Sequence, residues 1–227
     1  MESIADHKFF EEKPAVVSDL CRTDDTKDNS RKGSFDREIE DLLLYLNDLR
    51  QFVSTSSCSG RVIVFSQGAI GKGACQWHFV AHSEYTPTLL TSSVESLTKN
   101  PAFFENDVFL KFEPFILHVR CETLADAQKL HAISVQSGFR NSGITIRKKG
   151  KEGFAMHVAV RCTHNFEMPL VLNGKLVTNS ESLISIGELL ARKMQKNNDL
   201  IDRFFHSLKS AFEISKPDSD PATIQFF

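Results

Sequence analysis

The strongest hydrophobic pattern in the chain predicts a long helix near its C-terminal end. Apolar residues recur at helical spacing between Leu183 and Leu208, and Ser180 is a candidate N-cap before them. A second amphipathic helix is predicted from Ser34 to about Phe52. Shorter helices are predicted over about 88–97 and over 123–137, where a Thr-x-x-Asp capping box precedes the apolar positions and a glycine follows them.

Short segments rich in β-branched and aromatic residues predict strands between these helices. They cover residues 61–65, 75–82, 107–121, 144–149 and 154–162, and glycine-rich turns at 66–73 and 150–153 favour antiparallel hairpins. Pro114 interrupts one of these segments, and a proline cannot donate to a central ladder, so a bend or an edge position is expected there. The run TSSCSGR, residues 55–61, is predicted to be a turn between a helix and a strand.

Two stretches of the chain follow one plan of helix, Ser-Gly turn, strand, turn and strand. The first contains Ser59-Gly60 and the second contains Ser142-Gly143. We therefore predict an α+β fold with a mixed, largely antiparallel sheet, two pseudo-repeated helix–hairpin units and a long C-terminal helix. Under this hypothesis the two Ser-Gly turns lie around one cleft, whereas a chance similarity predicts no such relation.

Composition divides the chain into three expected parts. Residues 1–33 are polar and are expected to form a mobile arm, residues 34–213 a single catalytic domain, and residues 214–227 a flexible tail. A hydrophobic content of 41% suits a packed core, and a net charge of −2 restricts any RNA contact to a local basic patch.

The composition also argues against several classes of protein. No apolar stretch is long enough to span a bilayer, and the acidic N-terminus does not resemble a signal peptide, so a cytosolic or nuclear location is expected. The five cysteines are scattered and form no Cys-x-x-Cys pair. We therefore expect reduced thiols and no metal site.

Several polar motifs are candidates for chemistry, and each has a structural alternative. TSSCSGR could direct hydroxyls and backbone N–H groups at an anionic ligand, or it could be a solvated helix exit. Lys111 and Glu113 share one face of a strand, either as a surface ion pair or as a positioned acid and base. The turn GFRNSG could grip phosphate or base edges, or simply cap a helix. Trp77 is either a stacking platform or a core aromatic, and His118 fits a core position.

An ordered set of motifs resembles one known family. The set comprises KGSFD (32–36), TSSCSGR, W-x4-H at Trp77 and His82, LKFEPFILHV (110–119), GFRNSGI (138–144), and VRCTH with EMPL. Across roughly residues 31–213 the chain is similar to the family of tRNA wybutosine-synthesising protein 3. The resemblance implies an S-adenosylmethionine-dependent, cytoplasmic methyltransferase that acts on ring nitrogen N4 of the tricyclic base beside the anticodon of phenylalanine tRNA. Because no Rossmann-type glycine fingerprint is present, an unconventional cofactor-binding fold is expected.

The resemblance implies roles for individual residues. Candidate proton acceptors are His82 and Glu113. The cofactor is assigned to Ser56, Ser57, Cys58, Gly60 and Arg61, with Arg61 on its carboxylate. The anticodon loop of the tRNA, through its phosphates or modified base, is assigned to Trp77, Lys111, Arg140, Asn141, Ser142 and Arg161. Other enzymes of the same pathway are candidate partners, and the alternative function is a non-catalytic tRNA-binding module.

Overall fold

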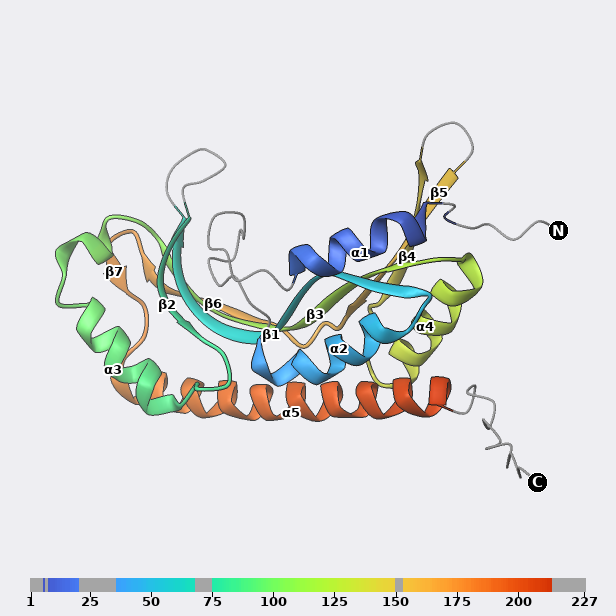
Figure 1. Ribbon diagram of the computed structural model, residues 1–227. Helices are drawn as coiled ribbons and strands as arrows, with labels where there is room; N and C mark the ends of the chain where they lie inside the picture. The colour runs from blue at the N-terminus through green and yellow to red at the C-terminus, as the bar shows by residue number, and fades with distance from the viewer. Residues whose placement is uncertain (1–5, 7, 21–35, 68–74, 150–152, 214–227) are drawn as a thin grey trace, which may run out of the picture.

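The computed structural model describes residues 6, 8–20, 36–67, 75–149 and 153–213. Its centre is one curled antiparallel sheet in which β2, β1, β3, β5 and β4 are successive neighbours, while β6 pairs with β3 and β7 with β6 (Figure 1). The strands are β1 (Phe52–Gln67), β2 (Cys75–Ala81), β3 (Val108–Cys121), β4 (Gly143–Lys149), β5 (Gly153–Arg161), β6 (Phe166–Leu172) and β7 (Lys175–Leu176). The predicted α+β class with a largely antiparallel sheet is confirmed.

Helices cover the two faces of the sheet unequally. The helices are α1 (Phe9–Leu20), α2 (Glu40–Asp48), α3 (Pro87–Leu97), α4 (Leu124–Gln136) and α5 (Ser180–Glu213), and two short 3-10 turns are η1 (Arg37–Ile39) and η2 (Pro101–Phe104). The long helix α5 runs the length of the sheet beside α2, α3 and α4, whereas α1 lies on the opposite side (Figure 1). Buried side chains of α5 join two apolar clusters, one with α2 and α4 and one with α3.

Local signals explain where several helices begin. The Thr123 side chain accepts a hydrogen bond from the Asp126 N–H, and the Asp126 carboxylate accepts one from the Thr123 N–H, so the predicted capping box is present. At α3, the Thr86 hydroxyl accepts from the Leu89 N–H and Pro87 occupies the first turn. These helices and α5 confirm the prediction from hydrophobic spacing.

The prediction of a turn at residues 55–61 is wrong. TSSCSGR lies inside the 16-residue strand β1 and pairs with β3, with Cys58 opposite Ile116 and Arg61 opposite Glu113. Cross-strand packing overrides the turn propensity of serine and glycine here. A short strand, β6, also replaces the connection that was expected around EMPL.

Pro114 lies in a central strand, so the expected edge position is wrong and a local break is observed instead. On the side of β3 away from β1, residues 108–112 pair with β6 and residues 116–121 pair with β5. Pro114 falls between these two partners, where a missing N–H removes no ladder bond. The buried face shifts phase at the same point, because both Phe112 and Phe115 are fully buried.

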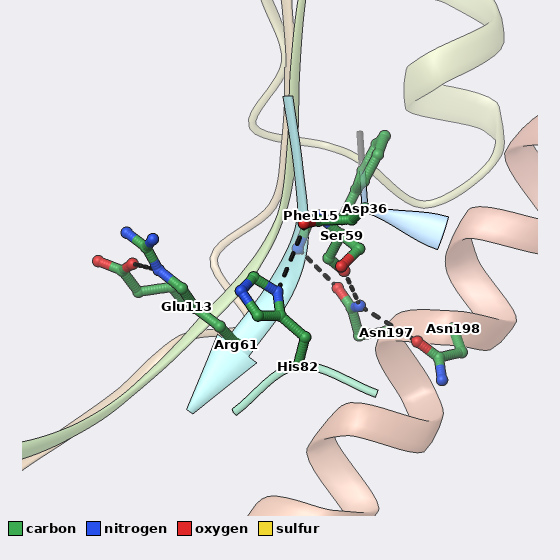
Figure 2. Close-up of polar contacts among 8 residues, drawn as sticks. All are labelled: Asp36, Ser59, Arg61, His82, Glu113, Phe115, Asn197 and Asn198. Carbon is green, nitrogen blue, oxygen red and sulfur yellow. Dashed lines mark hydrogen bonds and ion pairs between the residues drawn. The ribbon is translucent and has the colours of Figure 1, made fainter. Parts of the chain in front are cut away.

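Asn197 of α5 fills a gap between β1 and β3. Its side-chain NH2 donates to the Ser59 carbonyl at 2.7 Å, and its side-chain oxygen accepts from the Phe115 N–H at 2.7 Å (Figure 2). Gly60 follows with φ +107°, and a Cβ there would lie 2.9 Å from the Asn197 amide nitrogen. The glycine is therefore required both by the backbone conformation and by the close approach of Asn197.

The expected mobile arm needs correction at residues 9–20, which form α1. Arg120 of β3 is buried and donates from Nε to Asp6 at 2.7 Å and from Nη1 to Glu12 at 2.6 Å. Phe9 is also fully buried, so a few anchoring residues order a segment whose average composition is polar. Residues 21–33 of the expected arm and the expected tail at 214–227 lie outside the described residues.

The proposed internal repeat holds for the order of elements. Helix α2 precedes the hairpin β1–β2, and helix α4 precedes the hairpin β4–β5. The predicted equivalence of the two Ser-Gly turns is wrong, because Ser59-Gly60 lies within a strand whereas Gly143 begins one. The hairpin tips, at 68–74 and 150–152, lie outside the described residues.

The four cysteines in the described residues are free thiols, in agreement with the prediction. Among the described helices, none combines the length and the apolar character needed to cross a bilayer.

Replacing Asn197 with alanine should destabilise the fold. The change leaves the buried Ser59 carbonyl and Phe115 N–H without their partner, which costs about 2–4 kcal/mol. Urea unfolding at pH 7 measures the difference, and Gln195→Ala at an exposed position of the same helix serves as the control. A loss no larger than that of the control would contradict the bridging role of Asn197.

Candidate functional site

The face of the sheet opposite α5 carries a row of polar side chains, which we call the polar face. It is formed by Ser56, Cys58 and Arg61 of β1 and by Lys111, Glu113 and His118 of β3. Directly paired residues of antiparallel strands project to the same side, and Ser56 pairs with His118 as Arg61 pairs with Glu113. The intervening residues Phe112, Phe115 and Leu117 are buried against the helices.

One part of the polar face is a chain of charges beside the tryptophan. Arg61 Nε donates to Glu113 at 2.7 Å, while Lys111 Nζ lies 3.2 Å from Glu113 and 3.4 Å from Glu167. The Arg61 guanidinium lies 4.5 Å from the centroid of the Trp77 ring, a cation–π arrangement. Trp77 is 45% exposed, so it is a surface aromatic and not a core residue.

These contacts set the protonation of Glu113. Burial raises the pKa of the Glu113 carboxyl, but the hydrogen bonds and charges of Arg61 and Lys111 outweigh this effect and hold the pKa below its ordinary value. The pKa of Lys111 is raised: burial lowers it, but the two carboxylates outweigh that effect. Glu113 is therefore a fixed anion at neutral pH and a weak proton acceptor.

A second group gathers at the edge of β1, where Asp36, Cys58 and His82 meet. The Asp36 carboxylate accepts the Ser59 N–H at 2.7 Å and lies 3.5 Å from Nδ1 of His82. His82 is only 6% exposed, and its Nδ1 is buried without a hydrogen bond to the described part of the chain. Figure 2 shows the other ring nitrogen on the side of Arg61 and Glu113.

The same three residues offer ligand atoms that lie within 4.8 Å of one another. Aspartate, cysteine and histidine are all zinc ligands, but zinc binds the thiolate form of cysteine. Burial, together with the nearby Asp36 and Glu113 charges, raises the pKa of the Cys58 thiol against the opposing effects of the Gly60 hydrogen bond and Arg61. This environment disfavours the thiolate, and the absence of a metal site stays a prediction.

A third group lies further along β3. The Ser56 hydroxyl and Nδ1 of His118 are 2.9 Å apart. Burial and the neighbouring Arg161 charge lower the pKa of His118, so its ring is neutral at pH 7. The expectation that His118 is a core residue is wrong, because the phase of β3 after Pro114 places it on the polar face.

The structure brings most of the predicted site residues together, but not all of them. Ser57 pairs with Leu117, so its side chain projects toward the helices and away from Arg61. The Ser142 hydroxyl donates to the Phe139 carbonyl and accepts the Arg161 N–H, which are bonds of a capped turn. Arg140 and Asn141 are exposed in the same turn, and Arg161 Nε donates to the Asn141 carbonyl at 3.0 Å.

Comparisons with known proteins show the family of the chain. A sequence model described as Methyltransferase TYW3 matches residues 11–210. The chain belongs to the Methyltransferase TYW3 family. It is 40% identical over 190 residues to the tRNA wybutosine-synthesizing protein 3 homolog of Xenopus laevis, covering 82% of this chain and 71% of that protein. The homolog of Homo sapiens is also 40% identical, with 82% and 69% covered.

Solved structures share the fold of this TYW3 family member. The PH1069 protein from Pyrococcus horikoshii OT3 superposes with a TM-score of 0.72 at 24% identity, covering 92% of this chain and 98% of that chain. A hypothetical protein from Aeropyrum pernix gives a TM-score of 0.62 at 21% identity, with 78% and 99% covered. These likenesses support the non-Rossmann arrangement of the sheet and helices.

Three residues of this candidate site received no role from the sequence. Asp36 stood in the KGSFD motif and could have been found there, since an acidic residue beside a histidine often orients it. The face of His118 depends on the phase shift at Pro114, and Asn197 is one of many polar residues on α5. Neither of these two carries a local signal.

Replacing Glu113 with glutamine should make the free energy of unfolding less dependent on pH in the acidic range. The native pKa of Glu113 lies below its ordinary value of 4.5, so its ion pairs contribute fully above that pH and are lost as the pH falls through the native pKa. Urea unfolding should show the variant about 1 kcal/mol less stable at pH 7, with the gap closing toward pH 3. The exposed Glu188→Gln should show no such gap. A gap that is unchanged at pH 3 would contradict the ion-pair assignment.

Proposed function

We propose that this chain transfers a methyl group from S-adenosylmethionine to ring nitrogen N4 of the tricyclic wybutosine precursor beside the anticodon of phenylalanine tRNA. The observation that carries the proposal is the convergence of Asp36, Arg61, His82 and Glu113, which come from four separate segments. The family of the chain, Methyltransferase TYW3, indicates the class of reaction. Relatives named tRNA wybutosine-synthesizing protein 3 homolog indicate the pathway. The cytoplasm is the proposed location.

The polar face offers groups that fit the proposed cofactor. The Arg61 guanidinium gives its Nε–H to Glu113, so its terminal NH2 groups remain as donors for a carboxylate. The exposed Ser56 hydroxyl lies five residues away along β1 and would contact another part of the cofactor. The Glu113 carboxylate and the Trp77 ring favour a positive charge, such as that of a sulfonium. When bound, S-adenosylmethionine supplies the methyl group. Cys58 and Gly60 line the same stretch of β1, whereas Ser57 faces away from it.

His82 is the better of the two proposed proton acceptors. The acceptor nitrogen carries a proton that must leave as the new N–C bond forms. Asp36 faces Nδ1 of His82, which favours the tautomer with the proton on Nδ1 and the lone pair on Nε2. His82 Nε2 then takes the proton, while Glu113, whose pKa is lowered by its two cationic neighbours, remains an anion that positions Arg61 and Lys111.

The tRNA is proposed to approach along β4, β5 and the turn before β4. Arg140, Asn141 and Arg161 are exposed there, and Arg147 and Lys148 extend the basic edge along β4. Guanidinium and ammonium groups contact phosphates without reading sequence. Lys111 lies between Glu113 and Glu167, so we propose that it positions these carboxylates and contacts the substrate only through its remaining N–H.

A methyl-transfer assay tests the proposal. Labelled S-adenosylmethionine and phenylalanine tRNA from cells that lack this step should give labelled tRNA with the wild-type protein. His82→Asn should lower kcat by about 100-fold or more, the range of general-base catalysis, while the Kd for the tRNA is unchanged. His206→Asn, at an exposed position of α5, is the matched control.

The alternative function predicts a different pattern. A non-catalytic binding module would bind the tRNA tightly, but it would transfer no label and would show no affinity for S-adenosylmethionine. Equal kcat values for the wild type and His82→Asn would remove the assignment of the proton acceptor without removing the methyltransferase.

A further inference from the structure

The polar face contains a bare patch beside His118. Residues paired directly across the sheet share a face, and His118 pairs with Ala159, which in turn pairs with Gly143. A histidine on β3 is thus followed on β5 and β4 by two residues with almost no side chain. The patch lies on the outer face of the sheet only, because the neighbouring Val158 and Val160 of β5 point to the opposite face and are fully buried there.

Gly143 has no backbone reason to be glycine. It is absent from the described glycines with positive φ, which are Gly60, Gly138 and Gly174. A Cβ at Gly143 would meet nothing within 4 Å, whereas one at Gly138 would meet Leu200 at 2.7 Å. The missing side chain therefore leaves open space above the sheet.

Polar groups border this bare patch on several sides. His118 stands at one end, and its Nδ1 is held 2.9 Å from the Ser56 hydroxyl. Arg161 and Thr145 flank the patch on β5 and β4, each two residues from Ala159 or Gly143 on the same face, and both are exposed. Such a surface offers a flat apolar floor together with donors and acceptors at its edge.

We propose that Gly143 and Ala159 form the floor on which one planar base of the substrate RNA lies flat, with His118 and Arg161 at its edge. The inference rests on the proposed function for the nature of the ligand. Adjacent strands are about 4.8 Å apart, so the floor between β3 and β4 is about 10 Å wide and accommodates a fused ring system. A side chain larger than alanine at either floor position occupies the volume of the base.

The test variant is Gly143→Val. The backbone accepts valine because φ is not positive, a Cβ at this position has no neighbour within 4 Å, and β-branched residues favour strands. The midpoint temperature of its thermal unfolding should therefore be no lower than that of the wild type. Gly143→Ala provides a smaller side chain for a graded effect, and Ile146→Val, at an exposed position on the opposite face of β4, is the control.

The probe is phenylalanine tRNA that carries the unmethylated precursor, compared with the same tRNA after excision of that base. The wild type and Ile146→Val should bind the base-bearing tRNA about tenfold or more tightly than the excised one, because the base buries apolar surface on the floor. Gly143→Val should bind both tRNAs equally and weakly, and Gly143→Ala should lie between.

Two results would overturn the inference: a Gly143→Val protein that keeps the wild-type preference for the base, or a wild type that has no preference. Both are read from binding alone. A wild type that prefers the base but transfers no methyl group would instead remove the proposed enzymatic function and keep the floor.

Discussion

The two hydrogen bonds of Asn197 are the constraint on which the site depends. Asn197 inserts its amide between the Ser59 carbonyl and the Phe115 N–H, where β1 and β3 would otherwise bond directly. The positive φ of Gly60 and the phase shift at Pro114 occur at this point. Two residue pairs therefore reach the same face of the sheet. Arg61 and Glu113 lie on one side of the shift, and Ser56 and His118 lie on the other. Without this separation of the strands, one of the two groups would point into the core.

A single helix supports both halves of that face. Helix α5 contributes apolar residues to the two clusters that lie beneath the two ends of the sheet, and Asn197 lies between them. The polar face is therefore supported along its length by one rigid element. On its outer side, helix α1 covers the sheet only near Arg120. A methyl-transfer site needs such rigidity because alignment of donor and acceptor supplies much of the rate.

Charge on the polar face is balanced locally. Glu113 is shared by Arg61 and Lys111, and Asp36 is shared by the Ser59 N–H and His82. Of the two proposed proton acceptors, Glu113 is the poorer one, because a carboxylate stabilised by two cations resists protonation.

The sequence by itself determined helices α2 to α5, the hairpins and the set of motifs, because helical spacing, capping residues and alternation act over a few neighbouring positions. It missed α1, which depends on tertiary contacts with Arg120. It misplaced TSSCSGR, since serine and glycine favour turns locally and only pairing with β3 makes that run a strand. It also missed the roles of Asp36, His118 and Asn197. Those depend on which segments become neighbours and which face each residue takes, and only tertiary packing across the curled sheet decides that.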